Sequence, residues 1–272
     1  MLTVTTVQPT LSTWEAHHVA AISSLDGHRI PHVTQGDLAL VIPDLDLWDL
    51  WPVQLVDGST ADFDGWSLWM ILSAPILPDP DLQHHQARIR LAAYRSGHWR
   101  DCGNVLPDHL NIGSREWAGT ALFDPATFQL TLFYTASGYR GEATPSFAQR
   151  LCQTSTTLHM DAGTAQLGDW SPIVESVVAD GVDYIVVNQN EGIPGFIKGF
   201  RDPAHFRDPA TGVDYLYFTG SLKPATSDWN GVIGVARSTD GTHQIWELLS
   251  PVLSADGLNN ELERPVMIAR EG

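Results

Sequence analysis

The stretch GVIGVARSTDGTHQIWELL, residues 231–249, predicts two β-strands joined by a tight turn. The turn is placed at Asp240-Gly241, because Asp-Gly is a dipeptide that hairpin turns favour. Five further runs are rich in β-forming residues and end on turn residues: SLWMILSAP (67–75), ARIRLAAYR (87–95), LTLFYTASG (130–138), DYIVVNQN (183–190) and YLYFTGSL (215–222). A short helix is expected only around Ser12 to Ser23. The pattern favours an all-β sandwich, barrel or propeller over a fold in which strands and helices alternate.

The composition fits short strands joined by many turns. The 272 residues include 10 Trp, 23 Gly and 17 Pro, and 43% are hydrophobic, which is enough to bury a core in one large domain or two small ones. The sequence contains no strict internal repeat. Periodicity alone therefore does not distinguish a propeller from the other all-β folds.

The charge of the chain disfavours two classes of partner. With 15 Lys and Arg against 32 Asp and Glu, the formal net charge is −17, so nucleic acid and anionic membranes are not expected to bind. A neutral, hydroxyl-rich ligand is compatible with this surface. No apolar run approaches the ~20 residues of a membrane span, and no ordinary secretory signal opens the chain. We expect either cytoplasmic residence or secretion by a route without such a signal.

The motif LWDLWPVQ, residues 47–54, places Asp49 between Trp48 and Trp51. One interpretation is a turn in which the aspartate caps the backbone and the tryptophans pack beneath a loop. The other is a sugar site, where aromatic walls stack on the ring and the carboxylate attacks the anomeric carbon. Spacing alone leaves both open.

The motif FRDPAHF, residues 200–206, places Arg201 beside Asp202. A neighbouring arginine is expected to hold the aspartate ionised and to lower its pKa. The alternative is a surface ion pair of little energetic weight. The tripeptide recurs at 207–209, but that copy runs into Thr211-Gly212 and predicts a hairpin turn, so the first copy is the site candidate.

The motif NNELERPVMI, residues 259–268, carries Glu261 and Glu263 one residue apart. In an extended segment both carboxylates share one face, and like charges raise at least one pKa, as a general acid requires. Arg264 then lies on the opposite face unless the backbone twists. The alternative is a charged edge strand, and PVMIAREG (265–272) is expected to form a strand running into a turn. Together the three motifs supply a nucleophile, a charge stabiliser and an acid/base, the set of a retaining glycosidase.

These residues resemble a known family. LWDLWPVQ with the following DGS, then SREWAGTALF, FRDPAHF and ELERP, in this order, are similar to glycoside hydrolase family 68: the levansucrases, inulosucrases and bacterial β-fructofuranosidases that act on sucrose. The resemblance implies a five-bladed β-propeller with a funnel to an acidic pocket. We expect it here in part, as roughly the first three blades and the start of the next. Residues 1–40 are then an N-terminal arm, and residues 41–272 an incomplete catalytic domain.

The resemblance also implies a role for each motif residue. Asp49 corresponds to the nucleophile, Asp202 to the transition-state stabiliser and Glu263 to the general acid/base. The residues implied to line the fructosyl site are Trp48, Trp117, Arg201, Glu261 and Arg264. Ala118 stands where the family often has a serine, which removes a hydrogen bond to the nucleophile.

The resemblance carries expectations about metals and partners. Some family members hold calcium through an acidic residue directly before the acid/base motif. Asn260 takes that place here, so we predict no calcium, no other metal and no cofactor. The adjacent histidines His17-His18 and His84-His85 are expected on the surface. Cys102 and Cys152 could form a disulfide or remain buried thiols.

The implied substrates are sucrose and fructosyl acceptors. Family members are longer, so we expect either a second polypeptide that completes the propeller or little activity alone. Two alternatives remain: a carbohydrate-binding partial propeller without turnover, and a different propeller glycosidase such as an invertase or arabinanase.

Overall fold

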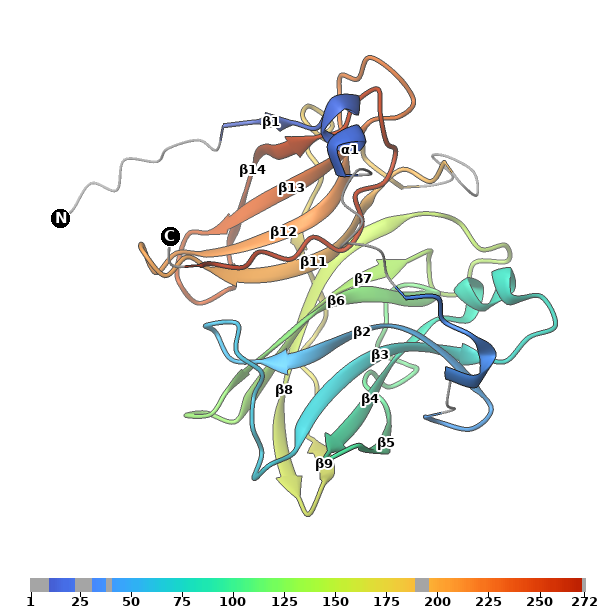
Figure 1. The fold of residues 1–272 in the computed structure, drawn as a ribbon. Helices are drawn as coiled ribbons and strands as arrows, with labels where there is room; N and C mark the ends of the chain where they lie inside the picture. The colour runs from blue at the N-terminus through green and yellow to red at the C-terminus, as the bar shows by residue number, and fades with distance from the viewer. Residues whose placement is uncertain (1–9, 23–30, 38–40, 189–195, 271–272) are drawn as a thin grey trace.

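The computed structural model describes residues 10–22, 31–37, 41–188 and 196–270. Almost all of its regular structure is β-strand (Figure 1). The helical segments are α1 (Ala16–Ile22) and the 3-10 helices η2 (Gln35–Asp37) and η3 (Pro80–Gln86). The strands are β1 (Ser12–Thr13), β2 (Leu45–Gln54), β3 (Ser67–Pro75), β4 (Arg88–Arg95), β5 (His98–Asn104), β6 (Arg115–Asp124), β7 (Gln129–Ser137), β8 (Gln149–Asp161), β9 (Thr164–Leu167), β10 (Val174–Val177), β11 (Phe200–Arg207), β12 (Asp214–Ser221), β13 (Gly231–Ser238) and β14 (Trp246–Ser254).

The strands form three antiparallel groups that follow the chain order. The first is β2-β3-β4-β5, the second is β6-β7-β8-β10 with β9 paired to β8, and the third is β11-β12-β13-β14 with β1 parallel to β14. The first two groups join where the ends of β2 and β6 pair in parallel, at Val53 with Ala121 and Gln54 with Leu122. The third group packs on the second through β11 and β6. In Figure 1, β6 and β7 lie between β2 and β11.

Two hydrophobic cores lie between these groups, and β7 contributes to both. Leu132 and Tyr134 belong to the core shared by the first two groups, whereas Phe133 belongs to the core between the second and third. This alternation follows from the period of two along a strand. In the second core the rings of Phe200 and Phe218 pack with centroids 4.9 Å apart. The two cores hold the three groups in fixed positions around β2, β6 and β11.

Most of the elements predicted from sequence are confirmed. The hairpin at 231–249 forms as β13 and β14, with Gly241 at a φ of 68°. The runs at 67–75, 87–95, 130–138 and 215–222 form β3, β4, β7 and β12. The predicted helix is shorter than expected, because Ser12 and Thr13 pair as β1 with β14 and the helix begins at Ala16; Ser23 lies outside the described residues.

Two predicted strands are wrong. In the run 183–190 the described part makes one isolated bridge, Tyr184 with Leu222, and residues 189–190 lie outside the described residues. The cause is local, because the Asp180 carboxylate accepts the backbone N–H groups of Val182, Asp183 and Tyr184 and holds them in a turn. Residues 265–270 also form no strand.

Both cysteines carry free thiols, so they do not form the disulfide that the sequence left open. Cys152 lies in the first core, and burial raises the pKa of its thiol to about 12. No helix in the described ranges is both long and apolar enough to span a membrane.

Candidate functional site

The three central strands each carry a β-bulge at a predicted site residue. The register shifts between Trp48 and Leu50 in β2, between Trp117 and Gly119 in β6, and between Arg201 and Ala204 in β11. The residues inside these shifts include Asp49, Ala118 and Asp202. A bulge bends its strand and re-aims a side chain, and bulges are common beside active sites. The local backbone thus explains why these particular residues leave the regular pleat.

Arg264 connects the last motif to the first. Its guanidinium lies 3.0 Å from Asp49 Oδ1, donates to the carbonyl oxygen of Leu50 at 3.0 Å and lies 5.9 Å from the centre of the Trp51 ring. The φ of Arg264 is 49°, which is the backbone twist that turns this side chain away from the alternation of an extended segment. The capping turn proposed as an alternative for LWDLWPVQ does not form, because these residues belong to β2.

Asp202 is 7% exposed and lies at the junction of the second and third groups. Its backbone N–H donates to Thr135 Oγ1 at 2.9 Å, and its Oδ2 accepts from the backbone N–H of Arg264 at 3.4 Å. Burial raises the pKa of Asp202 to about 6; the charge of Arg201, 3.7 Å away, opposes this, and the negative charge of Glu263 adds to it. Arg201 lowers this pKa as expected, but the net shift is upward, so the prediction of a lowered pKa is wrong: desolvation outweighs the arginine.

Arg201 holds the two glutamates of the last motif. This buried guanidinium, 4% exposed, lies 2.8 Å from Glu263 Oε1 and 3.0 Å from Glu261 Oε2. The shared arginine confirms that both carboxylates lie on one face. The burial of Arg201 excludes the alternative of a surface ion pair at FRDPAHF. Residues 261–264 form no strand, which excludes the alternative of a charged edge strand.

The two glutamates titrate in opposite directions. Burial disfavours both charged forms. At Glu261 burial prevails over Arg201 and, with the like charge of Glu263, raises the pKa. At Glu263 the charge and hydrogen bond of Arg201 outweigh burial and lower the pKa. The sequence predicts at least one raised pKa in this pair, and the structure assigns it to Glu261 rather than to the predicted general acid.

The remaining predicted residues surround this network. Trp48 is half-buried, and its ring lies 5.4 Å from that of His84. Trp117 is half-buried on β6, with the Arg115 guanidinium 5.5 Å from its ring centre. Ala118 is 2% exposed, and its carbonyl oxygen accepts from the hydroxyl of Thr135 at 3.2 Å.

Sequence reasoning missed two residues of the site, Thr135 and Thr219. Thr135 joins β6 to Asp202 through its hydroxyl, and Thr219 donates to the carbonyl oxygen of Leu262 at 2.9 Å. Both are fully buried threonines within strands. Threonine is common in strands, so nothing in the sequence marks these two.

A cavity of about 570 Å³ opens between the central strands and the last described residues. Its walls include Trp51 and Pro52 from β2, Ala118 from β6, and Asp202 from β11. Arg264 and residues 265–269 also line it, whereas Asp49 and Glu263 are not among its lining residues. A concave site of this size with apolar walls and a few converging polar groups suits a small ligand.

The described residues offer two places where a metal could be considered. At Asn260, which takes the place of the implied calcium ligand, Oδ1 accepts from the Lys198 ammonium at 2.9 Å. An added dication does not fit beside this positive charge.

His205, Asp214 and His243 bring ligand atoms within 4.8 Å of one another, but Arg207 already places two N–H groups on the Asp214 carboxylate, at 2.9 and 2.6 Å. The Asp214 carboxylate is therefore already engaged by the Arg207 charge and by contacts from both histidines, although Nδ1 of His205 has no hydrogen-bond partner among the described residues. His17, His18, His84 and His85 are exposed, as predicted.

Comparison with known proteins connects this arrangement to a family. The model of a levansucrase/invertase family matches residues 4–228. The levansucrase of Rahnella aquatilis is 26% identical over 309 residues, which cover 99% of this chain and 71% of that protein. An extracellular sucrase of Zymomonas mobilis is 26% identical over 262 residues, covering 87% of this chain and 62% of its own length.

Solved structures show the same fold. The inulosucrase from Halalkalicoccus jeotgali, bound to kestose, is 34% identical with a TM-score of 0.76, over 85% of this chain and 59% of that chain. The levansucrase from Gluconacetobacter diazotrophicus is 24% identical with a TM-score of 0.75, over 89% of this chain and 60% of that chain, and supports the fold alone. This chain thus spans about 60% of the solved relatives.

These neighbours are β-propellers, so the three antiparallel groups are propeller blades, and the predicted all-β propeller, present in part, is confirmed. The family model covers most of the residues that build the blades and carries the first two acidic motifs. The chain belongs to the levansucrase/invertase family, glycoside hydrolase family 68.

Proposed function

We propose that the chain carries the catalytic carboxyl groups of an enzyme that acts on sucrose, as a fructosyltransferase or a β-fructofuranosidase. One observation supports this most strongly. Asp49, Arg264, Asp202, Arg201 and Glu263 form an unbroken series of ion pairs and hydrogen bonds that joins three remote motifs at the central strands. The names of the relatives, levansucrase and sucrase, agree with this assignment.

The proposed mechanism is a double displacement. The Asp49 carboxylate attacks C2 of the fructosyl unit and forms an ester bond, while the bond from C2 to the glucose oxygen breaks and that oxygen takes a proton from Glu263. Water or a sugar hydroxyl then gives its proton to Glu263 and attacks C2, which releases Asp49. Retention requires the two carboxyl groups to lie about 5–5.5 Å apart around the substrate.

The glutamate pair supplies the proton. Both glutamates contact Arg201, and the pKa of Glu261 is raised while that of Glu263 is lowered, so a proton taken up by the pair binds to Glu261 in preference to Glu263. Transfer of that proton to Glu263 makes it the acid that meets the leaving oxygen. The Asp202 carboxylate stabilises the positive charge that develops on the fructosyl ring, while Arg201 keeps Asp202 and the glutamate pair oriented.

The test is incubation of the purified chain with sucrose and measurement of released glucose. Asp49→Asn should lower the rate at least about 1000-fold, because a neutral amide cannot form the covalent intermediate. Asp46→Asn is the matched control, since Asp46 lies on the same strand outside the network and should keep full activity. Sucrose binding without glucose release from the unmodified chain would instead favour the carbohydrate-binding alternative.

We also propose that a further polypeptide segment covers one flank of this chain in the active enzyme. Leu50, Val266 and Ile268 lie beside the cavity and are 47%, 72% and 72% exposed. Apolar side chains gathered beside a site mark a contact surface. A monodisperse monomer of these 272 residues with the turnover of a full-length relative would contradict this proposal.

A further inference from the structure

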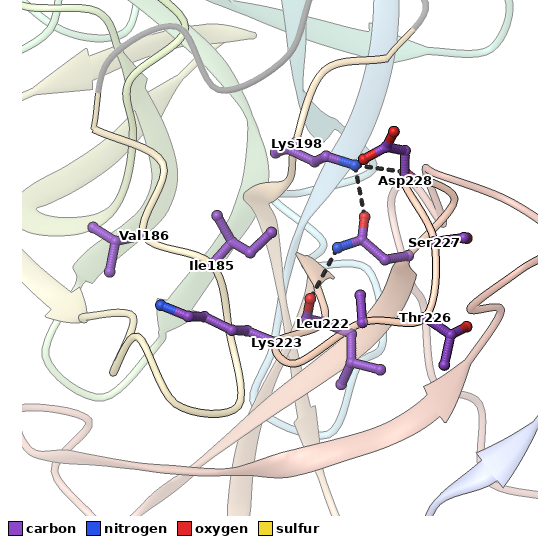
Figure 2. A pocket seen from close by; sticks show the side chains of 10 residues that line it. Ile185, Val186, Lys198, Leu222, Lys223, Thr226, Ser227 and Asp228 are labelled. Carbon is purple, nitrogen blue, oxygen red and sulfur yellow. Dashed lines mark hydrogen bonds between the residues drawn. The ribbon is translucent and has the colours of Figure 1, made fainter.

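Lys198 lies next to the candidate site and donates three hydrogen bonds. Its half-buried ammonium donates to Asn230 Oδ1 at 2.8 Å, to Asn260 Oδ1 at 2.9 Å and to the carbonyl oxygen of Asp228. Figure 2 shows this side chain at one end of an open pocket, with Asp228 next to it. An ammonium has three donors and no acceptor, so these three oxygens satisfy it completely.

The two asparagines are oriented for this role. Both are 2% exposed. The side-chain N–H groups of Asn230 donate to the carbonyl oxygen of Leu222 at 2.8 Å, and those of Asn260 donate to that of Ile197 at 2.9 Å. Each amide therefore keeps its oxygen toward Lys198. Three chain segments remote in sequence, around residues 198, 230 and 260, meet at one positive charge.

The segment that precedes the acid/base motif is packed tightly here. The backbone N–H of Gly231 donates to the carbonyl oxygen of Asn259 at 2.8 Å. A Cβ at Gly231 would lie 2.8 Å from the backbone of Asn260, so only glycine allows this approach. Asn260 is followed directly by Glu261, which lies 3.0 Å from Arg201. The position of Asn260 thus sets where the glutamate pair begins.

We propose that Lys198 is a positioning residue: a fixed internal cation that cross-links its own segment before β11, the loop before β13 and the segment leading to Glu261 and Glu263. A side chain thereby takes the place of a bound metal ion, at the residue where the family resemblance implied a calcium ligand. Its effect on catalysis rests on the proposed function, whereas its effect on the segment does not.

The chain offers an unusually clear comparison, because Lys198 and Lys223 are its two lysines. Both line the same pocket in Figure 2, and Lys223 is exposed. Competitive labelling of the unmodified protein with an amine-reactive anhydride, read by mass spectrometry, should modify Lys198 at least about tenfold more slowly than Lys223, because three charge-assisted hydrogen bonds must open first. Equal labelling rates would overturn the proposal.

A matched pair of variants tests the positioning role. Lys198→Met should increase amide hydrogen exchange across residues 258–264 by about tenfold or more, while Lys223→Met, which removes the same charge from the same pocket, should leave it unchanged. Equal exchange in the two variants would refute the cross-link. Neither EDTA nor millimolar calcium should move the melting temperature of the unmodified protein, and a calcium-dependent rise would refute the role as a metal substitute.

Kinetic measurements with sucrose test the proposed effect of Lys198 on catalysis. Lys198→Met should lower kcat about tenfold or more with little change in KM. It should also shift the pH dependence of kcat toward higher pH, because loss of a positive charge near Glu261 favours the neutral form of that carboxyl group. If kcat and the pH profile of Lys198→Met equal those of Lys223→Met, the proposed effect on catalysis is wrong. If the unmodified chain binds sucrose but releases no glucose, the carbohydrate-binding alternative is favoured over the proposed function, while labelling and exchange still decide the cross-link.

Discussion

Asp49, Asp202 and Arg264 share a positive φ, at 35°, 59° and 49°, although none of them is glycine. Such a backbone costs about 1–3 kcal/mol at each residue and persists only where the surroundings enforce it. The motifs identified these residues from sequence, because tryptophan, arginine and aspartate in these orders are distinctive. Their protonation could not be predicted in the same way. The raised pKa of Asp202 depends on burial by strands remote in sequence.

The pKa of Asp202 leads to a prediction about pH and stability. Its value of about 6 in the folded protein exceeds the ordinary 3.8, so the folded state binds more protons between these values. The free energy of unfolding should therefore fall as pH rises from about 4 to about 6, by roughly 3 kcal/mol at 1.36 kcal/mol per pKa unit. In Asp202→Asn this decline should be absent, so the difference in stability between variant and wild type should grow with pH and level off near pH 7.

Urea unfolding of both proteins from pH 4 to 8 measures that difference. Titrating groups that do not interact with Asp202, such as Glu116, are common to both proteins and cancel in the subtraction. A difference that does not change with pH would show that Asp202 does not titrate as described.

Strands and bulges were predictable to different degrees. The hairpin at 231–249 and four other runs could be predicted because turn dipeptides and β-forming residues are local signals. The bulges at Asp49, Ala118 and Asp202 could not, because a register shift depends on the partner strand. The strand predicted at 183–190 does not form for a related reason. The Asp180 carboxylate accepts backbone N–H groups at the start of this run, and the sequence pattern did not reveal this interaction.

A buried ion pair between β4 and β6 leads to a prediction about stability. The Glu116 side chain is fully buried and accepts from Arg88 Nε and from the backbone N–H of Ile89, both at 2.8 Å. Glu116→Gln should lower the free energy of unfolding by about 3 kcal/mol at pH 8, because it leaves the Arg88 charge without its buried partner. Asp108 contacts the same arginine at 2.6 Å but is 86% exposed, so Asp108→Asn should cost less than about 1 kcal/mol. Equal losses in urea unfolding would contradict this account.

The bulge in β6 gives a second prediction. A Cβ added at Gly119 would lie 1.9 Å from the carbonyl oxygen of Phe133 and 2.7 Å from Tyr134 Cα, both on the adjacent backbone of β7. Gly119→Ala should therefore push the two strands apart and cost about 3 kcal/mol or more, or prevent folding. Gly36→Ala, whose nearest atom would be 3.8 Å away, should change stability by less than about 0.5 kcal/mol. Expression level and thermal melting compare the two variants, and a stable Gly119→Ala protein would refute the close approach.

The blades are joined by contacts that carry no sequence signature. Between the second and third blades, Gln153 donates to the carbonyl oxygen of His243 at 3.0 Å and accepts from the indole N–H of Trp246 at 3.1 Å. Nothing distinguishes this glutamine from others in strands. The order of the motifs predicted the family and hence the propeller, whereas the packing between blades required the structure.

The exposed flank beside the cavity gives a prediction for the molecule as a whole. Val266 and Ile268 are each 72% exposed and line the same cavity as Leu50, so they present apolar surface beside the site. If this surface is a contact site, the purified chain should self-associate as its concentration rises, and replacing both residues with threonine should suppress this without lowering the melting temperature. The control is the pair Val178→Thr and Val182→Thr, whose side chains are 62% and 67% exposed away from the cavity. Light scattering across a concentration series measures the association. Equal suppression by the two pairs would show that general surface hydrophobicity, rather than this flank, drives it.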